Sequence, residues 1–478
     1  MTQQAIPDVY APGEEAGPLA PTRALAEFVS AATYETLPER VIADAKLAFL
    51  DWLGSTLGGA LEEPARIARR VVGLLGVAEV ATILPDGRSS AAGAALANGV
   101  AAHILEFDDI HKGSTIHGAA PILPAALAVA EREGADGRTL LLATVLGYEA
   151  GLRVGEAVNP SHYHYWHPTG TAATFGAAVA AGTVLGLTAG QMRDALGSAG
   201  TQAAGLWEFN ADGTMSKHLH PGKAAFNGVL AADLAREGFT GAGRILEGER
   251  GFCRAMSTDP DLSRITADLG GSWKISENCY KLHSCCGHTH SALDTALDLR
   301  ADRGWDAGGA ARAIAGVRIE IYGPGYEIVR EMAPRTPYQG KFSIAYCVAV
   351  ALHEGRVGLA QFSPDRFGPD GPSEPTIAAL LHRTTVAVAP DLTARYPARW
   401  PARLTLTLAD GTILTGGADY PRGNPENPVT PAVLETKFRD LIVPHYGDAL
   451  AERAIAAVRD LDRYPDVGAL LREVLAAR

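Results

Sequence analysis

The chain has 478 residues and a formal charge of -12, with 47% hydrophobic and 20% charged residues. This length exceeds what one hydrophobic core usually supports, so two domains are expected, and the composition excludes a disordered chain. The acidic charge argues against nucleic-acid binding, which requires a basic surface. Five cysteines form no disulfide framework in a chain this long, which favours a reducing compartment, with the cytoplasm as the default.

The first part of the chain is predicted to be helical. Residues 1–21, rich in Pro and Glu, are expected to form a flexible arm and not a signal peptide. From residue 22 to residue 276, apolar residues recur at helical spacing between short Gly, Pro or Asp breaks. The uncharged stretch 170–190 is long enough to raise a membrane span as an alternative, but its small Gly, Ala and Thr residues favour a helix buried inside the protein.

Beyond residue 277 the pattern changes to include strands. Residues 316–323 (GVRIEIYG) and 403–421 (RLTLTLADGTILTGGADYP) show period-two alternation, and ADGT indicates a hairpin. Helical patterns lie between them, so residues 277–422 are predicted to form an α+β domain. The segment 423–478 is helical again and can pack on the first body. The expected fold is therefore mainly α. If the last segment packs on the first body, residues 22–276 and 423–478 form one helical domain and the α+β domain is an insertion in it.

Histidines are the strongest chemical signal, since 11 of the 14 fall in four short clusters: His103, His111 and His117; His162, His164 and His167; His218 and His220; His283, His288 and His290. A single histidine is more often a surface or satisfied core residue, but four clusters together indicate a site. In the first cluster, His117 is a candidate general acid or base in a turn that also holds Glu106. Asp108 and Asp109, taken alone, are better explained as helix caps or solvated turn residues.

The next two clusters offer groups for binding an anion. His167 precedes the glycine-rich opening of a buried helix, where free backbone amides favour a carboxylate, although a loop that fills a surface groove explains the segment equally well. Lys217 and Lys223 flank His218 and His220 around a Pro-Gly break. Solvated lysines are the usual alternative, but a lysine beside a buried Ala-rich helix needs a partner, so Lys217 is the preferred functional residue.

The fourth cluster raises the question of a metal. Its cysteines and histidines suit zinc, but their spacing matches no regular zinc motif, so a loop that brings Lys281 and a thiol to a pocket is preferred. Neither a dinucleotide fingerprint nor a P-loop occurs, and the spaced cysteines of an iron–sulfur cluster are absent. We therefore expect neither a metal nor a cofactor.

The same segments resemble one known family. EFDDIH followed by a histidine, HPTGT, KHLHPGKAA, GFTGAGRILEGERGF and a lysine followed by CCGHTH together resemble the MmgE/PrpD family, over nearly the whole chain. The resemblance implies an inserted α+β lid on a helical domain formed by both chain ends, and a homodimer. It also implies a cofactor-independent lyase of the 2-methylcitrate dehydratase type, which abstracts a proton next to a carboxylate of a small di- or tricarboxylic acid.

The resemblance also implies a set of site residues: His117, His167, Lys217 and Tyr346 as catalytic, and Glu106, Ile110, Lys281 and Cys286 as substrate-binding. Glu106, Ile110 and Cys286 stand where a decarboxylase of the family is expected to have Asp, Thr and His. The loss of two proton donors argues against decarboxylation of cis-aconitate, and a cysteine at this position is similar to the iminodisuccinate epimerase branch. A dicarboxylate epimerase or isomerase and a non-catalytic carboxylate-binding protein are therefore the alternatives, with the substrate and the identity of the base left open.

Overall fold

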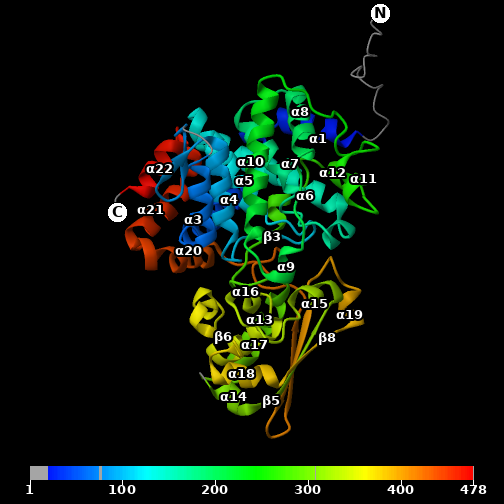
Figure 1. The fold of residues 1–478 in the computed structure, drawn as a ribbon, viewed down its shortest axis with the longest axis vertical. Helices are drawn as coiled ribbons and strands as arrows, with labels where there is room; N and C mark the ends of the chain where they lie inside the picture. The colour runs from blue at the N-terminus through cyan, green and yellow to red at the C-terminus, as the bar shows by residue number, and fades with distance from the viewer. Residues whose placement is uncertain (1–19, 75–77, 307, 477–478) are drawn as a thin grey trace, which may run out of the picture.

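The computed structural model describes residues 20–74, 78–306 and 308–476, and within them the fold is mainly α (Figure 1). The predicted arm lies outside the described residues, except at its last two positions. There the structure differs slightly, because α1 (Pro21–Ala31) already begins at Pro21. Proline suits this position, since its fixed φ fits the first turn of a helix and its missing N–H would have no partner there.

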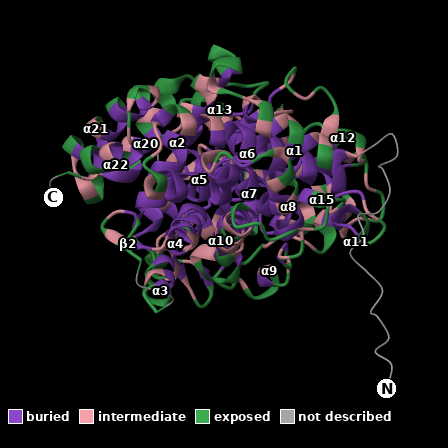
Figure 2. Ribbon diagram, turned by 90° about the horizontal axis from the view of Figure 1, so that it is seen from above, coloured by how far each residue is buried: buried purple, intermediate pink, exposed green. Residues whose placement is uncertain are grey.

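Three buried helices form the centre of the helical part: α5 (Ala119–Glu133), α6 (Gly137–Val158) and α7 (Ala173–Val184). Figure 2 shows them as the buried middle of the molecule. A Cβ on Gly176 would lie 2.6 Å from the carbonyl oxygen of Gly147, so the crossing of α6 and α7 depends on glycine. The predicted buried helix within 170–190 is confirmed. Among the described residues, no helix combines the length and hydropathy needed to cross a bilayer.

Helices from both ends of the chain share this core. The N-terminal contributors include α2 (Glu39–Gly59), α4 (Ala91–His103), α8 (Ala189–Gly200) and α10 (Ser216–Arg236), and the C-terminal ones are α20 (Pro431–Tyr446), α21 (Asp448–Arg459) and α22 (Val467–Leu475). Figure 1 shows the C-terminal helices at the left edge of the helical part, where α20 packs against α2; α3 (Glu63–Val72) packs against α4. A buried ion pair of 2.6 Å between Lys437 and Asp51 joins α20 to α2.

The part predicted to be all-helical also contains short strands, which corrects that prediction. β1 (Ala81–Ile83) and β2 (Gly87–Ser89) form an antiparallel hairpin, and β3 (Ile110–His111) pairs with β4 (Asn278–Cys279). Asn98 on α4 supports the hairpin by accepting from the Leu84 amide at 2.9 Å. Strands of two or three residues are too short to show a period of two, so the pattern of the sequence could not reveal them.

The second core contains a four-stranded sheet in the order β10-β9-β5-β8. β9 (Ala402–Leu408) and β10 (Ile413–Ala418) form the predicted hairpin, and β5 (Ile314–Ile321) runs parallel to β8 (Thr384–Val388). Three longer helices belong to this core: α13 (His290–Asp302), α17 (Ile344–Glu354) and α18 (Pro375–His382). The remaining short helices include α9 (Phe209–Asp212), α11 (Phe252–Met256), α12 (Ser263–Thr266), α14 (Gly309–Ala313), α15 (Gly323–Val329), α16 (Pro337–Lys341) and α19 (Pro390–Thr393).

The two cores meet around β3. Ile110 on this strand packs in the second core although it precedes α5 in the chain. Its pairing with Cys279 joins the helical part to the start of the α+β unit. Figure 1 shows β3 and α9 at the junction of the two units. This junction is where the candidate site lies.

Candidate active site

A small cavity at the junction collects most of the predicted site residues. Its volume is about 20 Å³, close to the space of a single water molecule. Seven of the eight predicted residues line it: Glu106, Ile110, His117, His167, Lys217, Lys281 and Cys286. We call it the inner cavity.

Two lysines converge on Glu106 in the inner cavity. The Nζ of Lys217, on α10, contacts Oε1 of Glu106, and the Nζ of Lys281 lies 3.5 Å from Oε2. Burial by itself would raise the pKa of the Glu106 carboxyl, but the two lysines outweigh burial and hold this pKa well below its usual range. The site therefore contains two charged ammonium groups whose present partner is a carboxylate of the protein.

Glu106 holds this position with a strained backbone. Its φ is 55°, in the left-handed region that residues with a side chain rarely adopt. Such a conformation costs on the order of 1 kcal/mol and is found mainly at functional sites.

Asp108 links two histidines at the same cavity. One of its oxygens, Oδ2, lies 2.7 Å from Nδ1 of His103 and 3.3 Å from Nδ1 of His117. Burial would raise the pKa of Asp108, but His103 and His117 lower it well below its usual range, so the carboxylate stays ionised. Burial lowers the pKa of His117 to about 4 even though Asp108 opposes that shift. His117 is therefore neutral at pH 7 and able to accept a proton.

A second pair of histidines completes the polar wall. Nδ1 of His167 lies 3.0 Å from Nδ1 of His220, so one of the two rings donates a hydrogen bond to the other. Burial and the neighbouring His220 lower the pKa of His167 well below its usual range, and burial lowers that of His220 to about 4. The ring centroids of His117 and His167 are 6.3 Å apart. Two neutral imidazoles thus stand close enough to act on one small substrate.

Asp109 has a different role from its neighbour. It accepts hydrogen bonds from the Tyr148 hydroxyl at 2.5 Å, the Asn278 amide at 2.8 Å and the backbone N–H of Ala119 at 3.1 Å. Ala119 is the first residue of α5, so Asp109 satisfies an amide at the start of a helix. The helix-cap interpretation therefore fits Asp109, whereas Asp108 belongs to the histidines.

Tyr346 is the predicted residue that the structure does not bring to the inner cavity. Its hydroxyl donates to the backbone carbonyl of Gln361 at 2.6 Å, and its ring packs against Phe362 and Phe367. Its catalytic role remains a prediction. Cys286 does line the cavity, but burial raises the pKa of its thiol to about 12, so the thiol stays protonated.

Three further residues of the site were not selected from the sequence: His103, Asp108 and Lys341. The Nζ of Lys341 donates to the carbonyl oxygen of Leu105 at 2.7 Å, next to Glu106, and burial lowers its pKa to about 8. His103 and Asp108 both stood in the recognised histidine cluster, so the cluster was the available signal. Lys341 had none, since it follows a Tyr-Gln-Gly segment far along the chain.

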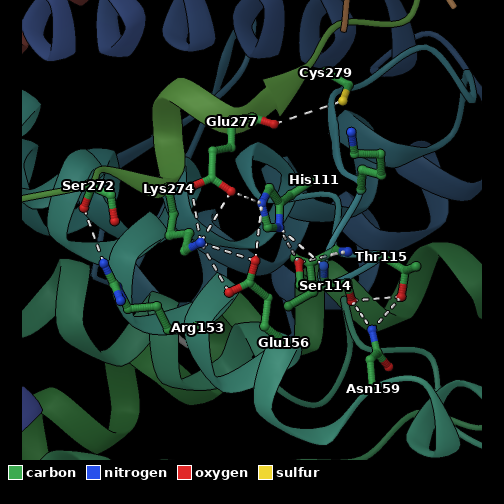
Figure 3. A network of polar contacts seen from close by, with 12 residues as sticks. His111, Ser114, Thr115, Arg153, Glu156, Asn159, Ser272, Lys274, Glu277 and Cys279 are labelled. Carbon is green, nitrogen blue, oxygen red and sulfur yellow. Dashed lines mark hydrogen bonds and ion pairs between the residues drawn. The ribbon is translucent and has the colours of Figure 1, made fainter. Parts of the chain in front are cut away.

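Two groups among the described residues place possible metal ligands close together. The donor atoms of His103, His117 and His167 lie within 4.8 Å of one another, as do those of His111, Glu156 and Glu277. In the second group, shown in Figure 3, the Nζ of Lys274 lies 3.1 Å from each carboxylate and supplies the positive charge. In the first group, Lys281 is close enough to lower the pKa of His117 and would repel a cation.

The fourth histidine cluster does not converge on one point. His283 lies 3.1 Å from Asp294, His288 hydrogen-bonds Tyr322, and His290 lies 3.3 Å from the carbonyl oxygen of Cys285. The rings of His283 and His290 also meet edge to face, with their centroids 5.1 Å apart, whereas His288 lines the inner cavity.

Comparison with known proteins identifies the family of this chain. The model of the MmgE/PrpD N-terminal domain matches residues 23–265, and that of the MmgE/PrpD C-terminal domain matches residues 283–463. The chain belongs to the MmgE/PrpD family. Among similar proteins of this family, a cis-aconitate decarboxylase of Aspergillus terreus is 29% identical over 403 residues, covering 79% of this chain and 80% of that protein. The cis-aconitate decarboxylase of Homo sapiens is 28% identical over 449 residues, covering 91% of this chain and 90% of the human protein.

Proposed function

We propose that this MmgE/PrpD protein is a cofactor-independent lyase that moves a proton next to a carboxylate of a small di- or tricarboxylic acid. The observation that carries the proposal is the inner cavity itself, where Lys217 and Lys281 face the same space as neutral His117 and His167. Fixed cations bind carboxylates and stabilise the negative charge that develops when a neighbouring C–H bond is broken. Similarity to proteins named cis-aconitate decarboxylase supports lyase-type action on a carboxylic acid.

In this proposal a substrate carboxylate takes the place of Glu106 on Lys217 and Lys281. His117 acts as the base, because Asp108 lies 3.3 Å from its other ring nitrogen and stabilises the imidazolium that forms. The electron pair of the broken C–H bond forms a carbon–carbon double bond as a hydroxyl group leaves from the adjacent carbon. The leaving oxygen takes a proton from the ring N–H of neutral His167, and the imidazolium of His117 returns one to that ring, so the products are an alkene and water and both rings end neutral.

The α+β unit is proposed to act as an inserted lid. It contributes Lys281 and Cys286 to the inner cavity, whereas Glu106, His117 and Lys217 come from the helical part. A volume of about 20 Å³ does not hold a dicarboxylic acid, so the inner cavity must widen to admit one. The expected homodimer belongs to the proposal as well.

Epimerisation is the second candidate, and the thiol of Cys286 is the observation that favours it. An epimerase removes a proton from one face of a carbon and returns one to the other face, which requires a base and an acid. His117 supplies a base, and the protonated Cys286 thiol in the same cavity supplies an acid. A family member that only binds carboxylates is the third possibility.

One experiment separates these candidates. Methylcitrate, aconitate, malate-type and amino-dicarboxylate substrates are incubated with the enzyme in heavy water and followed by mass and ultraviolet absorbance. A lyase changes the alkene absorbance, or changes the mass of the acid by that of the molecule eliminated or added. An epimerase changes the mass only by incorporating deuterium and forms no alkene. If every acid binds in calorimetry and none reacts or exchanges, the lyase proposal is wrong. Replacement of the exposed His164 by alanine serves as the control for His117→Ala.

A further inference from the structure

A much larger cavity lies beside the inner one. This outer cavity has a volume of about 640 Å³, within the range of small-molecule sites, and it shares Thr115 and Tyr163 with the inner cavity. We propose that carboxylate substrates reach the inner cavity through this outer cavity and that Tyr163 is the movable partition between the two. The inference rests on the proposed function only for the charge of the substrate.

The two shared residues differ in how firmly they are held. Thr115 is fixed from the outer side, because the Nδ2 of Asn159 donates to its hydroxyl at 3.0 Å and to the carbonyl oxygen of Ser114 at 2.7 Å (Figure 3). The Tyr163 hydroxyl has no hydrogen-bond partner within the described ranges, and the aromatic ring that its own ring contacts there is that of Trp207, edge to face at 5.0 Å. A side-chain rotation of Tyr163 therefore breaks no hydrogen bond.

The hydroxyl of Tyr163 can also donate a hydrogen bond to an anion. Burial raises the pKa of its hydroxyl well above the usual value, and the nearby groups Cys286 and Glu106 act in the same direction. The hydroxyl therefore remains a donor at every physiological pH. A donor without a partner between two chambers can hold a carboxylate as it passes.

The alternative route is less suited to an anion. A third cavity of about 450 Å³ shares Ile328 and Phe342 with the inner cavity, and its lining contains Asp212, Glu327 and Glu331 against one guanidinium, that of Arg330. This excess of carboxylates repels a negatively charged substrate.

The charges of the outer cavity are closer to balance than those of the third cavity, because the lining carboxylates Glu156, Glu277 and Glu426 all have a lysine partner. Its carboxylates Glu156 and Glu277 both bind Lys274 at 3.1 Å, and Glu426 pairs with Lys112. Arg264 and His111 also line it. The outer cavity therefore repels an anion less than the third cavity does, which favours the outer cavity as the route.

The route is tested with a matched pair of exposed alanines, one at each cavity. Ala398 lines the outer cavity and Ala211 lines the third cavity, so Ala398→Trp and Ala211→Trp each obstruct one route without disturbing a core. The readout is alkylation of Cys286, measured by peptide mass mapping with iodoacetamide and with the bulkier N-phenylmaleimide. Both reagents attack the thiolate, so the ratio of their rates cancels any change in thiol ionisation.

We expect Ala398→Trp to lower the bulky-to-small rate ratio by about tenfold and Ala211→Trp to change it by less than about twofold. Tyr163→Ala should raise the ratio, while Tyr163→Phe, which keeps the ring, should leave it unchanged. The opposite ranking of the two tryptophan variants overturns the proposal, as does a Tyr163→Ala protein whose Cys286 is no more reactive than in the wild type. Labelling requires no turnover, so a failed route and a failed enzymatic function give different results.

Discussion

Replacing Asp108 with asparagine removes one negative charge from the centre of the histidine pair and keeps the shape of the side chain. In the wild type this fully buried carboxylate lies 2.7 Å from His103 and 3.3 Å from His117. If His117 is the base, the carboxylate matters most after the proton has been transferred, because it then faces an imidazolium. The substitution should therefore affect the rate of the chemical step more than substrate binding.

The size of the effect follows from the contacts. The Oδ2 of Asp108 lies 3.3 Å from Nδ1 of His117 outside hydrogen-bond geometry, so the contribution lost is the attraction between a carboxylate and an imidazolium. At an effective dielectric constant of about 20 this attraction is about 5 kcal/mol, and each 1.4 kcal/mol is about tenfold in rate, so even half of it lowers kcat by roughly 10- to 100-fold. Loss of the bond that orients His103 adds to this. We expect kcat to fall by about 100-fold or more while KM changes by less than about threefold.

The pH profile gives a second readout. Asp108 raises the pKa of His117, so Asp108→Asn should move the acid limb of kcat/KM to lower pH. Asp109→Asn is the matched control, since Asp109 is the neighbouring buried aspartate but binds Tyr148, Asn278 and the α5 amide. It should lower the melting temperature with little change in the pH profile. Equal kinetics in Asp108→Asn and the wild type would refute the assignment of His117 as a base supported by Asp108.

Four other outcomes are expected. Lys217→Met should lower the free energy of unfolding by about 3–5 kcal/mol, because Glu106 loses a buried partner. In chemical denaturation the double variant Lys217→Met/Glu106→Gln should recover stability but not activity, and a fully active double variant would contradict the role of Lys217. The pKa of His117 is lower in the folded than in the unfolded chain, so the unfolded chain binds more protons below about pH 6.5. The free energy of unfolding should therefore fall as the pH drops from about 6.5 toward 4, by up to about 1.4 kcal/mol per pH unit. Urea titrations of wild type and His117→Gln test this, and equal dependence of that free energy on pH in the two proteins would contradict it. Dialysis against EDTA should leave turnover unchanged, because the nearby ammonium groups supply the positive charge; a stoichiometric metal whose removal stops turnover would show otherwise. Tyr346→Phe should change kcat by less than about threefold because its hydroxyl is engaged elsewhere, and a larger loss would mean that it reaches the substrate in another conformation.

Elements long enough to show a regular sequence pattern could be predicted from the sequence. The Gly- and Ala-rich stretch of α7 and the ADGT hairpin of β9 and β10 are local signals, and both are confirmed. The strands of β1, β2 and β3 were missed because they are too short for a period. Long-range packing decides which helices share a core. Periodicity alone therefore could not show that α2 packs against α20.

The positions of most candidate residues could be predicted from the sequence, but their contacts could not. The histidine clusters and the family motifs led to His117, His167 and Lys217, which do meet at the inner cavity. The division of labour between Asp108 and Asp109 could not be predicted, because it depends on the backbone angles of an irregular turn. Tyr346 has the expected position in the sequence, but the direction of its hydroxyl is decided by the carbonyl of Gln361.

Solvent proton exchange at the carbon next to a substrate carboxylate tests the central claim most directly. The acid that the panel identifies is incubated in heavy water with wild type, His117→Gln and His164→Gln, each shown to be folded, and deuterium is counted by mass. We predict that His117→Gln loses about 100-fold or more of the exchange or elimination rate while the substrate still binds, and that His164→Gln behaves as the wild type. Undiminished proton chemistry in His117→Gln would contradict the account.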